Sequence, residues 1–267
     1  PDPACVSPIT LASPDQRLHE RLGHAPALST CPACRLADGS CHVHRSVPPE
    51  VVSRGVLSVD LTGPHPRSRH GFTYALVACF RPAENVSAEP VALPYIRWLK
   101  GKSGPEVSKA VASCIAQINA EFETQVVFRL HSDKGGEFLN SEMSKVLADH
   151  SVFQTFTEGS DPRSNGVAER NVGILKLRAR AMLSTAKLGV GYWPLALNHA
   201  AFLRRLALLG KLLPSNVLTF GDTVSVRKRD ALESSFHPRT SFARYLGACD
   251  RIPGGAYVTL NGSRGAV

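Results

Sequence analysis

The sequence predicts an α/β protein in which a mixed sheet of five strands is flanked by helices. Three strand-like runs adjoin one another, and two further runs alternate with helix-like segments, an order that implies a mixed sheet. At 267 residues the chain is long enough for one main domain with small appendages. The five strands are expected at 56–61, 72–80, 91–99, 126–131 and 152–157.

The first and fourth predicted strands each end on an aspartate. Val56, Ser58 and Asp60 alternate with apolar residues until a Thr-Gly-Pro turn at 62–64. Asp133 closes the fourth run and is followed by two glycines, which let the backbone leave the strand sharply and approach a substrate closely. Both acids are therefore placed where a strand gives way to a turn.

Helices are predicted from the spacing of apolar residues and from runs without proline. The segment 105–122 carries Val107, Val111, Ile115 and Ile118 on one face. Further helices are expected at 141–150, 167–188 and 192–213, and the last of these is hydrophobic on much of its circumference. Short strands at 223–226 and 256–260 predict a small β-rich extension after the helices.

Three carboxylates on separate elements point to chemistry on phosphodiesters. Asp60 and Asp133 end strands, and Glu169 lies in the first turns of the helix that begins at 167. The chain has 22 acidic residues, so the local context of these three carries the argument rather than their number. Such a trio can hold two divalent cations that place an attacking and a leaving oxygen in line. Phosphoryl transfer on nucleic acid is the leading hypothesis.

Composition favours a polyanionic partner and a reducing compartment. The formal net charge is +9 and the pI is near 9.4, and lysine and arginine release counterions when they neutralise phosphates. No apolar run approaches the roughly 20 residues that span a bilayer, and no secretory signal layout is present. We therefore expect a soluble, intracellular protein. Because the chain opens on Pro1 rather than methionine, we expect it to be a segment of a longer polypeptide.

The first 50 residues are rich in proline, histidine and cysteine and show little hydrophobic periodicity. Within them, His19, His24, Cys31 and Cys34 supply four ligands for a tetrahedral structural zinc, whose binding free energy can replace a missing core. Two alternatives remain open: other ligands can compete, or the cluster holds no metal. The competing ligands are Cys41, His42 and His44.

Several motifs resemble the integrases of copia-type retrotransposons and the catalytic core of retroviral integrases. They are Val-Asp-Leu-Thr-Gly-Pro at 59–64, His-Ser-Asp-Lys-Gly-Gly-Glu-Phe at 131–138, and Pro-Arg-Ser-Asn-Gly-Val-Ala-Glu-Arg at 162–170. Further likeness lies at 192–194, 236–240 and 245–247, so that the resemblance covers about 18–257. It implies a ribonuclease-H-like core at 51–213, preceded by a zinc-binding module at 1–50 and followed by the extension at 214–267.

The resemblance also implies a function. The implied function is that of a DNA integrase, which trims the ends of element DNA and joins them to target DNA. Asp60, Asp133 and Glu169 would hold the two Mg²⁺ or Mn²⁺ ions that this reaction uses. Structural Zn²⁺, homo-oligomers and action in the nucleus are expected with it. In this fold the ends of the first and fourth strands lie side by side, which would bring the two aspartates together.

DNA contacts are expected beside the carboxylates. By resemblance, Asn165 and Gly166 lie near the reacting phosphate. Lys176 and Arg180 follow Glu169 by seven and eleven residues, close to two and three helical turns, so all three share one helix face. Two neighbours have plainer interpretations. His131 is expected to be hydrogen-bonded and inert inside the sheet. Glu137 is expected to be a solvated loop residue, and the alternative is an extra acid of the metal site.

The chain departs from the copia pattern in two places. Only six residues separate His24 from Cys31, and the stretch 81–89 is longer than the usual polar turn. Two alternative functions follow. The protein is an inactive or repurposed remnant that binds nucleic acid without cutting it, or it is a ribonuclease-H-like nuclease or transposase of another lineage. The histidine and cysteine pairs before the core and the copia-like tail argue against the second alternative.

Overall fold

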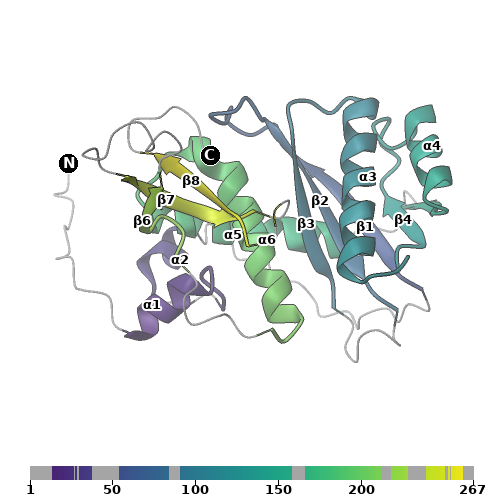
Figure 1. The fold of residues 1–267 in the computed structure, drawn as a ribbon. Coiled ribbons are helices and arrows are strands. Elements are labelled where there is room, and N and C mark those ends of the chain that lie inside the picture. Colours follow the sequence, from purple (N-terminus) through teal and green to yellow (C-terminus); the bar gives the residue numbers. More distant parts are fainter. Residues whose placement is uncertain are drawn as a thin grey trace, which may run out of the picture.

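The core of the protein is a five-stranded mixed sheet with helices on both faces (Figure 1). A computed structural model describes residues 14–26, 28, 30–37, 54–83, 91–157, 166–211, 218–227, 239–249, 252 and 254–260. The strand order is β3-β2-β1-β4-β5, with antiparallel pairing from β3 to β1 and parallel pairing from β1 to β5. The strands are β1 (Val56–Thr62), β2 (Tyr74–Arg81), β3 (Leu93–Leu99), β4 (Arg129–Ser132) and β5 (Phe153–Phe156). The expected ribonuclease-H-like arrangement is confirmed.

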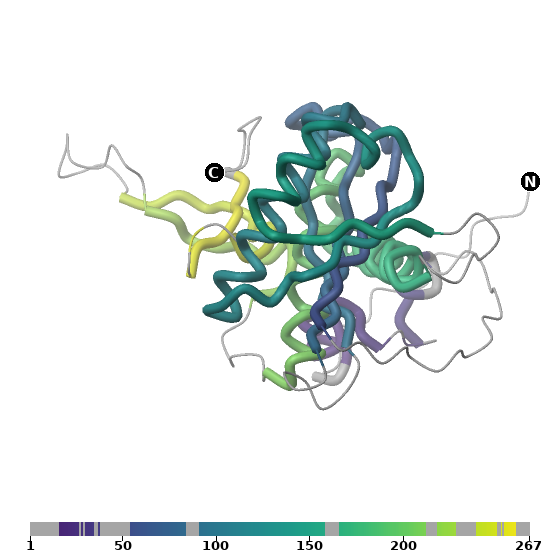
Figure 2. Tube along the Cα trace, turned by 90° about the vertical axis from the view of Figure 1, so that its right-hand side faces the viewer, coloured from purple at the N-terminus to yellow at the C-terminus, as the bar shows by residue number. Residues whose placement is uncertain are grey.

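Each face of the sheet is covered by its own pair of helices. On one face lie α3 (Gly104–Glu121) and α4 (Ser141–Asp149), and on the other lie α5 (Gly166–Thr185) and α6 (Trp193–Leu208), which follows the short 3₁₀ helix η1 (Val190–Tyr192). Figure 2 shows α3 and α4 in front of the sheet. The predicted apolar stripe of α3 is fully buried: Val107, Val111, Ile115 and Ile118 are each 0% exposed. Burial of this stripe fixes α3 against β2 and β3.

The alternation of the strands assigns side chains to the two faces. In β1, Leu57 and Val59 belong to the hydrophobic cluster under α3 and α4. In β2, Val77 and Cys79 belong to the cluster under α5 and α6. Because successive strand residues point to opposite faces, Asp60, which follows Val59, faces the side of α5.

Two predicted boundaries are wrong for identifiable reasons. The fourth strand begins at Arg129 rather than at 126, because the amides of Val126 and Val127 are bonded by the Asn119 side chain instead of a neighbouring strand. The helix expected at 192–213 ends at Leu208, and Gly210 follows with φ 62°, a left-handed conformation that terminates helices.

The N-terminal segment forms two helices that the sequence did not predict. These are α1 (Pro14–Arg21) and α2 (Pro32–Ala37). The buried residues Cys31, Ala33, Cys34 and Ala37 pack against Ala181 and Leu177 of α5. Long-range packing on α5, rather than local periodicity, therefore accompanies α2.

A three-stranded antiparallel sheet follows the helices and extends away from the main body (Figure 2). Its strands are β6 (Thr223–Arg227), β7 (Thr240–Ala248) and β8 (Ala256–Leu260), so the two expected strands are confirmed and β7 is an addition. Leu246 of β7 and Phe220 are buried in the same cluster as α6. Among the helices that the structure describes, none is long and apolar enough to cross a membrane.

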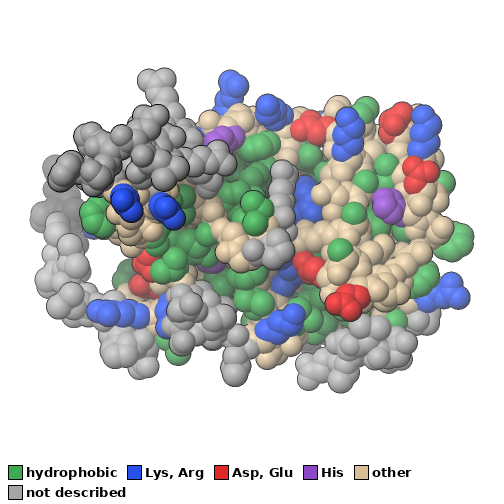
Figure 3. Space-filling model, in the orientation of Figure 1, with side chains coloured by type: hydrophobic (Ala, Val, Ile, Leu, Met, Phe, Trp, Pro, Cys, Tyr) green, Lys and Arg blue, Asp and Glu red, His purple; other side chains and the backbone are tan. Residues whose placement is uncertain are grey.

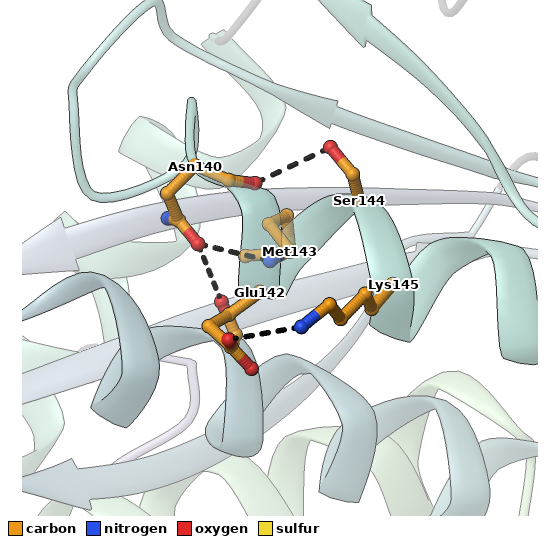
Figure 4. A network of polar contacts seen from close by, with 6 residues as sticks. Asn140, Glu142, Met143, Ser144 and Lys145 are labelled. Atoms are coloured by element: carbon orange, nitrogen blue, oxygen red, sulfur yellow. Dashed lines mark hydrogen bonds and ion pairs between the residues drawn. The ribbon is translucent and has the colours of Figure 1, made fainter.

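The loop between Asp133 and α4 is closed by an N-cap (Figure 4). The Asn140 side chain accepts a hydrogen bond from the Met143 amide at 2.9 Å, and its Nδ2 donates to the Glu137 carbonyl at 2.8 Å. The Asn140 side chain thus pairs a free backbone amide in the first turn of α4 and also holds the preceding loop.

Removing this cap should destabilise the core. We expect Asn140→Ala to lower the free energy of unfolding by about 1 kcal/mol, because the Met143 amide loses its acceptor and the contact with the Glu137 carbonyl is also lost. Asn140→Asp, which keeps an acceptor for Met143, should lose less. Urea unfolding of the three proteins measures the difference, and equal midpoints for Asn140→Ala and the parent protein would contradict it.

Candidate active site and zinc site

The parallel pairing of β1 with β4 brings two of the predicted acids to one edge of the sheet. Ser58 is the register partner of His131. Asp60 and Asp133 each lie two residues further along, so both lie at the C-terminal ends of neighbouring strands and on the same face. Asp60 is half-buried, whereas Asp133 is exposed and its Oδ1 accepts the Gly135 amide at 3.1 Å.

The third acid comes from the helix that covers this face. Glu169 lies in the first turn of α5 and is exposed, and α5 packs on β1 and β2. The strand ends and the N-terminal turn of α5 thus carry the three acids from separate parts of the chain. This is the arrangement that the order of elements predicted.

The electrostatic state of Asp60 shows that the three acids act on one another. The pKa of Asp60 is raised to about 6: burial is the largest cause, the negative charges of Asp133 and Glu169 act in the same direction, and the backbone of Leu61 and the Lys176 ammonium oppose them. A carboxyl group that is partly desolvated and faces two other carboxylates is a place where a cation would be stabilised.

The three acids do not close around a single point. Within the described residues, the acids do not form a group whose ligand atoms all lie within 4.8 Å of one another. A fourth carboxylate lies beside Asp133. A Cβ on Gly135 would lie 2.9 Å from Oε2 of Glu137 and 3.1 Å from Oδ1 of Asp133, so both acids flank this glycine. This closeness keeps open the alternative that Glu137 is an extra acid of the metal site.

Of the two cations predicted to contact DNA from α5, Lys176 is half-buried and Arg180 is exposed. Lys176 is half-buried and its charge acts on Asp60, so it faces the acids. Burial lowers the pKa of Lys176, and the nearby Arg180 lowers it further. Arg180 is exposed, and Gly166 is the first residue of α5. Asn165 lies outside the described residues.

Two histidines lie near the acids. His131 Nδ1 is 3.0 Å from Thr155 Oγ1 on β5, which confirms its expected hydrogen bond within the sheet. His65 was missed. It follows the turn after Asp60, its Nε2 is 3.2 Å from Thr62 Oγ1, and burial and the charge of Lys176 lower its pKa. The sequence signal for His65 was only its place five residues after Asp60.

The N-terminal cluster has the geometry of a tetrahedral metal site. His19, His24, Cys31 and Cys34 are all buried, and their ligand atoms lie within 4.8 Å of one another. The His19 Nε2 to His24 Nδ1 distance is 3.2 Å, and the nitrogen–sulfur distances are 3.2, 3.4 and 3.6 Å. Ligands around a tetrahedral zinc are about 3.3 Å apart for two nitrogens and about 3.6 Å for nitrogen and sulfur.

Local structure holds the four ligands in place. His19 lies on α1, and the chain turns back through Gly23 and His24, whose φ values are 63° and 60°. The amide of His24 bonds the carbonyl of His19 at 2.9 Å, which closes this turn. Cys31 and Cys34 lie on either side of the start of α2. The short connection between His24 and Cys31 therefore still brings all four ligands together.

The protonation state of the cluster suits zinc. Burial, together with the charge of His19, lowers the pKa of His24 to about 4, and burial also lowers that of His19, so both shifts favour the neutral imidazoles that ligate metals. The residues present thus fit a zinc ion. The competing ligands Cys41, His42 and His44 lie outside the described residues.

The zinc cluster contacts the helix that carries Glu169. His24 turns Nδ1 toward the other three residues of the cluster, and its other nitrogen, Nε2, lies 3.3 Å from Oγ1 of Thr185 at the end of α5. A metal-bound imidazole is oriented by the partner of its second nitrogen. One end of α5 therefore bears a candidate catalytic acid, and the other end touches a zinc ligand.

Comparison with known proteins agrees with the motifs. No protein-family model matches the chain. A stretch of 75 residues, 28% of the chain, is 36% identical to the retrovirus-related Pol polyprotein of transposon TNT 1-94 from tobacco. The chain resembles a retrotransposon polyprotein. It spans about 6% of that polyprotein's length. The catalytic core domain of BIV integrase aligns with a TM-score of 0.37 at 20% identity, covering 61% of this chain and 89% of that domain.

The contact between Thr185 and His24 makes a prediction about zinc affinity. We expect Thr185→Val to weaken zinc binding by about 10-fold or more, because the imidazole loses its orienting partner. Thr185→Ser keeps the hydroxyl and should bind zinc as the parent protein does. Competition with a chromogenic chelator measures both. If the valine and serine variants hold zinc equally tightly, the contact has no orienting role.

The raised pKa of Asp60 makes a prediction about stability. Its pKa is 3.8 when unperturbed and about 6 in the folded protein, so ionisation costs stability as the pH rises from about 4 to about 6. In a metal chelator at pH 8, Asp60→Asn should therefore be more stable than the parent, on the order of 1 kcal/mol.

The difference should shrink as the pH falls toward 4, because the parent carboxyl is then protonated as well. Thermal unfolding at several pH values measures this dependence. Asp149→Asn, which removes an exposed acid from α4, serves as the control and should show no such trend. A gain for Asp60→Asn that is the same at pH 4 and pH 8 would contradict the assignment.

Proposed function

We propose that the protein is the DNA integrase of a retrotransposon, which performs 3′-end processing and strand transfer by metal-dependent phosphoryl transfer. The observation that carries this proposal is the meeting of Asp60, Asp133 and Glu169 at one edge of the sheet, where the latter two raise the pKa of the first. The ribonuclease-H-like strand order and the likeness to a retrotransposon polyprotein support it.

The acids are proposed to hold two Mg²⁺ or Mn²⁺ ions, because carboxylate oxygens suit these hard cations. When bound, such ions lower the pKa of an attacking water or 3′-hydroxyl and stabilise the departing oxygen. Asp60 is the central ligand in this proposal, since it is half-buried and its pKa is raised by the other two acids. Its carboxylate must be ionised to bind a cation, so at limiting metal concentration activity should rise as the pH increases toward about 6, and added metal should move this rise to lower pH.

The spread of the acids suits two ions better than one. Two catalytic metals lie about 3.5 to 4 Å apart, so their ligands need not gather around one point. Asp133 and Glu169 are both exposed, which leaves their side chains free to turn toward a bound ion. Mutual repulsion between the carboxylates would favour the separated positions until cations offset it.

Nucleic acid is proposed to lie along the face of α5 that carries Glu169. Lys176 and Arg180 extend from the acids on this face, and Gly166 and Asn165 precede it. Figure 3 shows Lys and Arg side chains distributed over the view of Figure 1 rather than gathered in one patch, so net charge alone does not define a binding face. In this proposal, the binding face is defined by Lys176 and Arg180 beside the acids.

The remaining parts of the proposal follow from the same identity. Zinc on His19, His24, Cys31 and Cys34 would hold the N-terminal module against α5. The active assembly would be a homo-oligomer on element ends and target DNA, since two DNA ends must be joined at one target. It would act in the nucleus.

Strand transfer with oligonucleotide substrates tests the proposal. The parent protein should join a 3′-hydroxyl end to target DNA in Mg²⁺ or Mn²⁺ and not in a chelator. Asp133→Asn should reduce the rate at least about 100-fold, because loss of even an outer-shell metal partner costs 10 to 100-fold. Asp149→Asn serves as the matched control.

The same assay separates the alternatives. A parent protein that binds DNA and leaves it uncut in both metals would favour a nucleic-acid-binding remnant. A protein that cleaves DNA without joining ends would favour another ribonuclease-H-like nuclease. Either result would overturn the integrase assignment.

A further inference from the structure

Arg178 of α5 and Arg204 of α6 lie close enough for their charges to act on each other, on the side of α5 away from the acids. Arg178 follows Glu169 by nine residues, which is two and a half helical turns, so it points away from the candidate active site. It shares a stripe of α5 with Asn171, seven residues earlier. Arg204 extends from α6, which packs on α5, and its Nε donates to Oδ1 of Asn171 at 2.9 Å.

The geometry directs the two guanidinium groups toward the same place. Helical side chains lean toward the N-terminus of their helix, so Arg178 leans toward the turn that holds Asn171, where Arg204 is bonded. Each side chain is between exposed and buried. Asn171 also donates from Nδ2 to the Val167 carbonyl at 2.9 Å, which fixes the acceptor that Arg204 uses.

The pair lacks a counter-charge within the described residues. The charged group that acts on Arg178 is Arg204, and together with burial it lowers the pKa of Arg178 to about 10. Burial also lowers the pKa of Arg204, and the group that opposes this is the buried thiol of Cys79. In the described part of the chain, Arg178 makes no hydrogen bond or ion pair. Two desolvated like charges are unfavourable unless an anion joins them.

We propose that Arg178 and Arg204 form an anion site that takes a phosphate group. Guanidinium groups present planar pairs of N–H donors that match phosphate oxygens, and two of them neutralise such an anion better than one. The phosphate belongs either to a nucleic-acid backbone or to free phosphate. This site lies on the opposite side of α5 from Glu169 and does not rest on the proposed catalytic function.

Thermal unfolding of the zinc-loaded protein tests the site. Inorganic phosphate should raise the midpoint of the parent protein above that in chloride at matched ionic strength. Arg178→Met/Arg204→Leu should weaken this phosphate affinity by about 10-fold or more, because each charge-assisted contact is lost. In chloride alone, the loss of the unpaired charges should offset the loss of the hydrogen bond from Arg204 to Asn171, so the midpoint of this variant should stay close to that of the parent.

Two further variants control for folding and for net charge. Arg178→Lys/Arg204→Lys keeps both charges without the paired donors and should retain an intermediate phosphate affinity. Lys102→Met/Lys109→Met removes two exposed charges elsewhere and should respond to phosphate as the parent does. A phosphate response that is equal in all four proteins would overturn the proposal.

Measurements with a DNA duplex and with inorganic phosphate identify the source of the phosphate. The site is assigned to nucleic acid if a short DNA duplex stabilises the parent more than the Met/Leu variant. This difference should be lost when neutral methylphosphonates replace the backbone phosphates. Stabilisation by inorganic phosphate but not by the duplex assigns it to free phosphate. Acetate that stabilises the parent as well as phosphate does would mean that the pair takes a carboxylate, and would overturn the assignment.

Discussion

Parallel pairing of β1 with β4 is the constraint on which the candidate active site depends. The register that sets Ser58 beside His131 also sets the two aspartates at one edge, on the face covered by α5. A slip of one residue would send one acid to the opposite face, under α3 and α4. Burial of Leu57 and Leu130 in the cluster below those helices holds the register, because a slip would take one of these side chains out of that cluster and put a polar neighbour in its place. Chemistry at the edge is thus tied to packing in the core.

Helix α5 connects the functional parts of the molecule. Its first turn carries Glu169, its middle packs on β1 and β2, and its last turn ends at Thr185, which contacts the zinc ligand His24. The opposite stripe carries Arg178, which faces α6. Packing on the strands and the contact at Thr185 fix the backbone of α5, while the exposed Glu169 side chain stays free to turn. Zinc binding far from the acids would therefore stabilise the backbone position of one of them.

Much of the fold was predictable from the sequence because its signals are local. The five strands, the buried stripe of α3 and the four zinc-ligand candidates follow from periodicity and residue type. Features decided by tertiary contacts were not. Helix α2 packs on Ala181, and β4 starts late because the Asn119 side chain accepts hydrogen bonds from two amides that were expected in the strand. For the site, the meeting of the acids was predictable from topology. The distances between their carboxylate oxygens were not predictable, because they depend on the side-chain orientation of the exposed residues Asp133 and Glu169.

Anomalous diffraction from crystals grown with Mn²⁺ and an oligonucleotide mimicking an element end would test the central claim most directly. The account predicts two manganese ions about 3.5 to 4 Å apart. Oxygens of Asp60, Asp133 and Glu169 should lie about 2.0 to 2.5 Å from one ion or the other. Manganese found only at other residues, with the three carboxylates still apart beside bound DNA, would contradict the account.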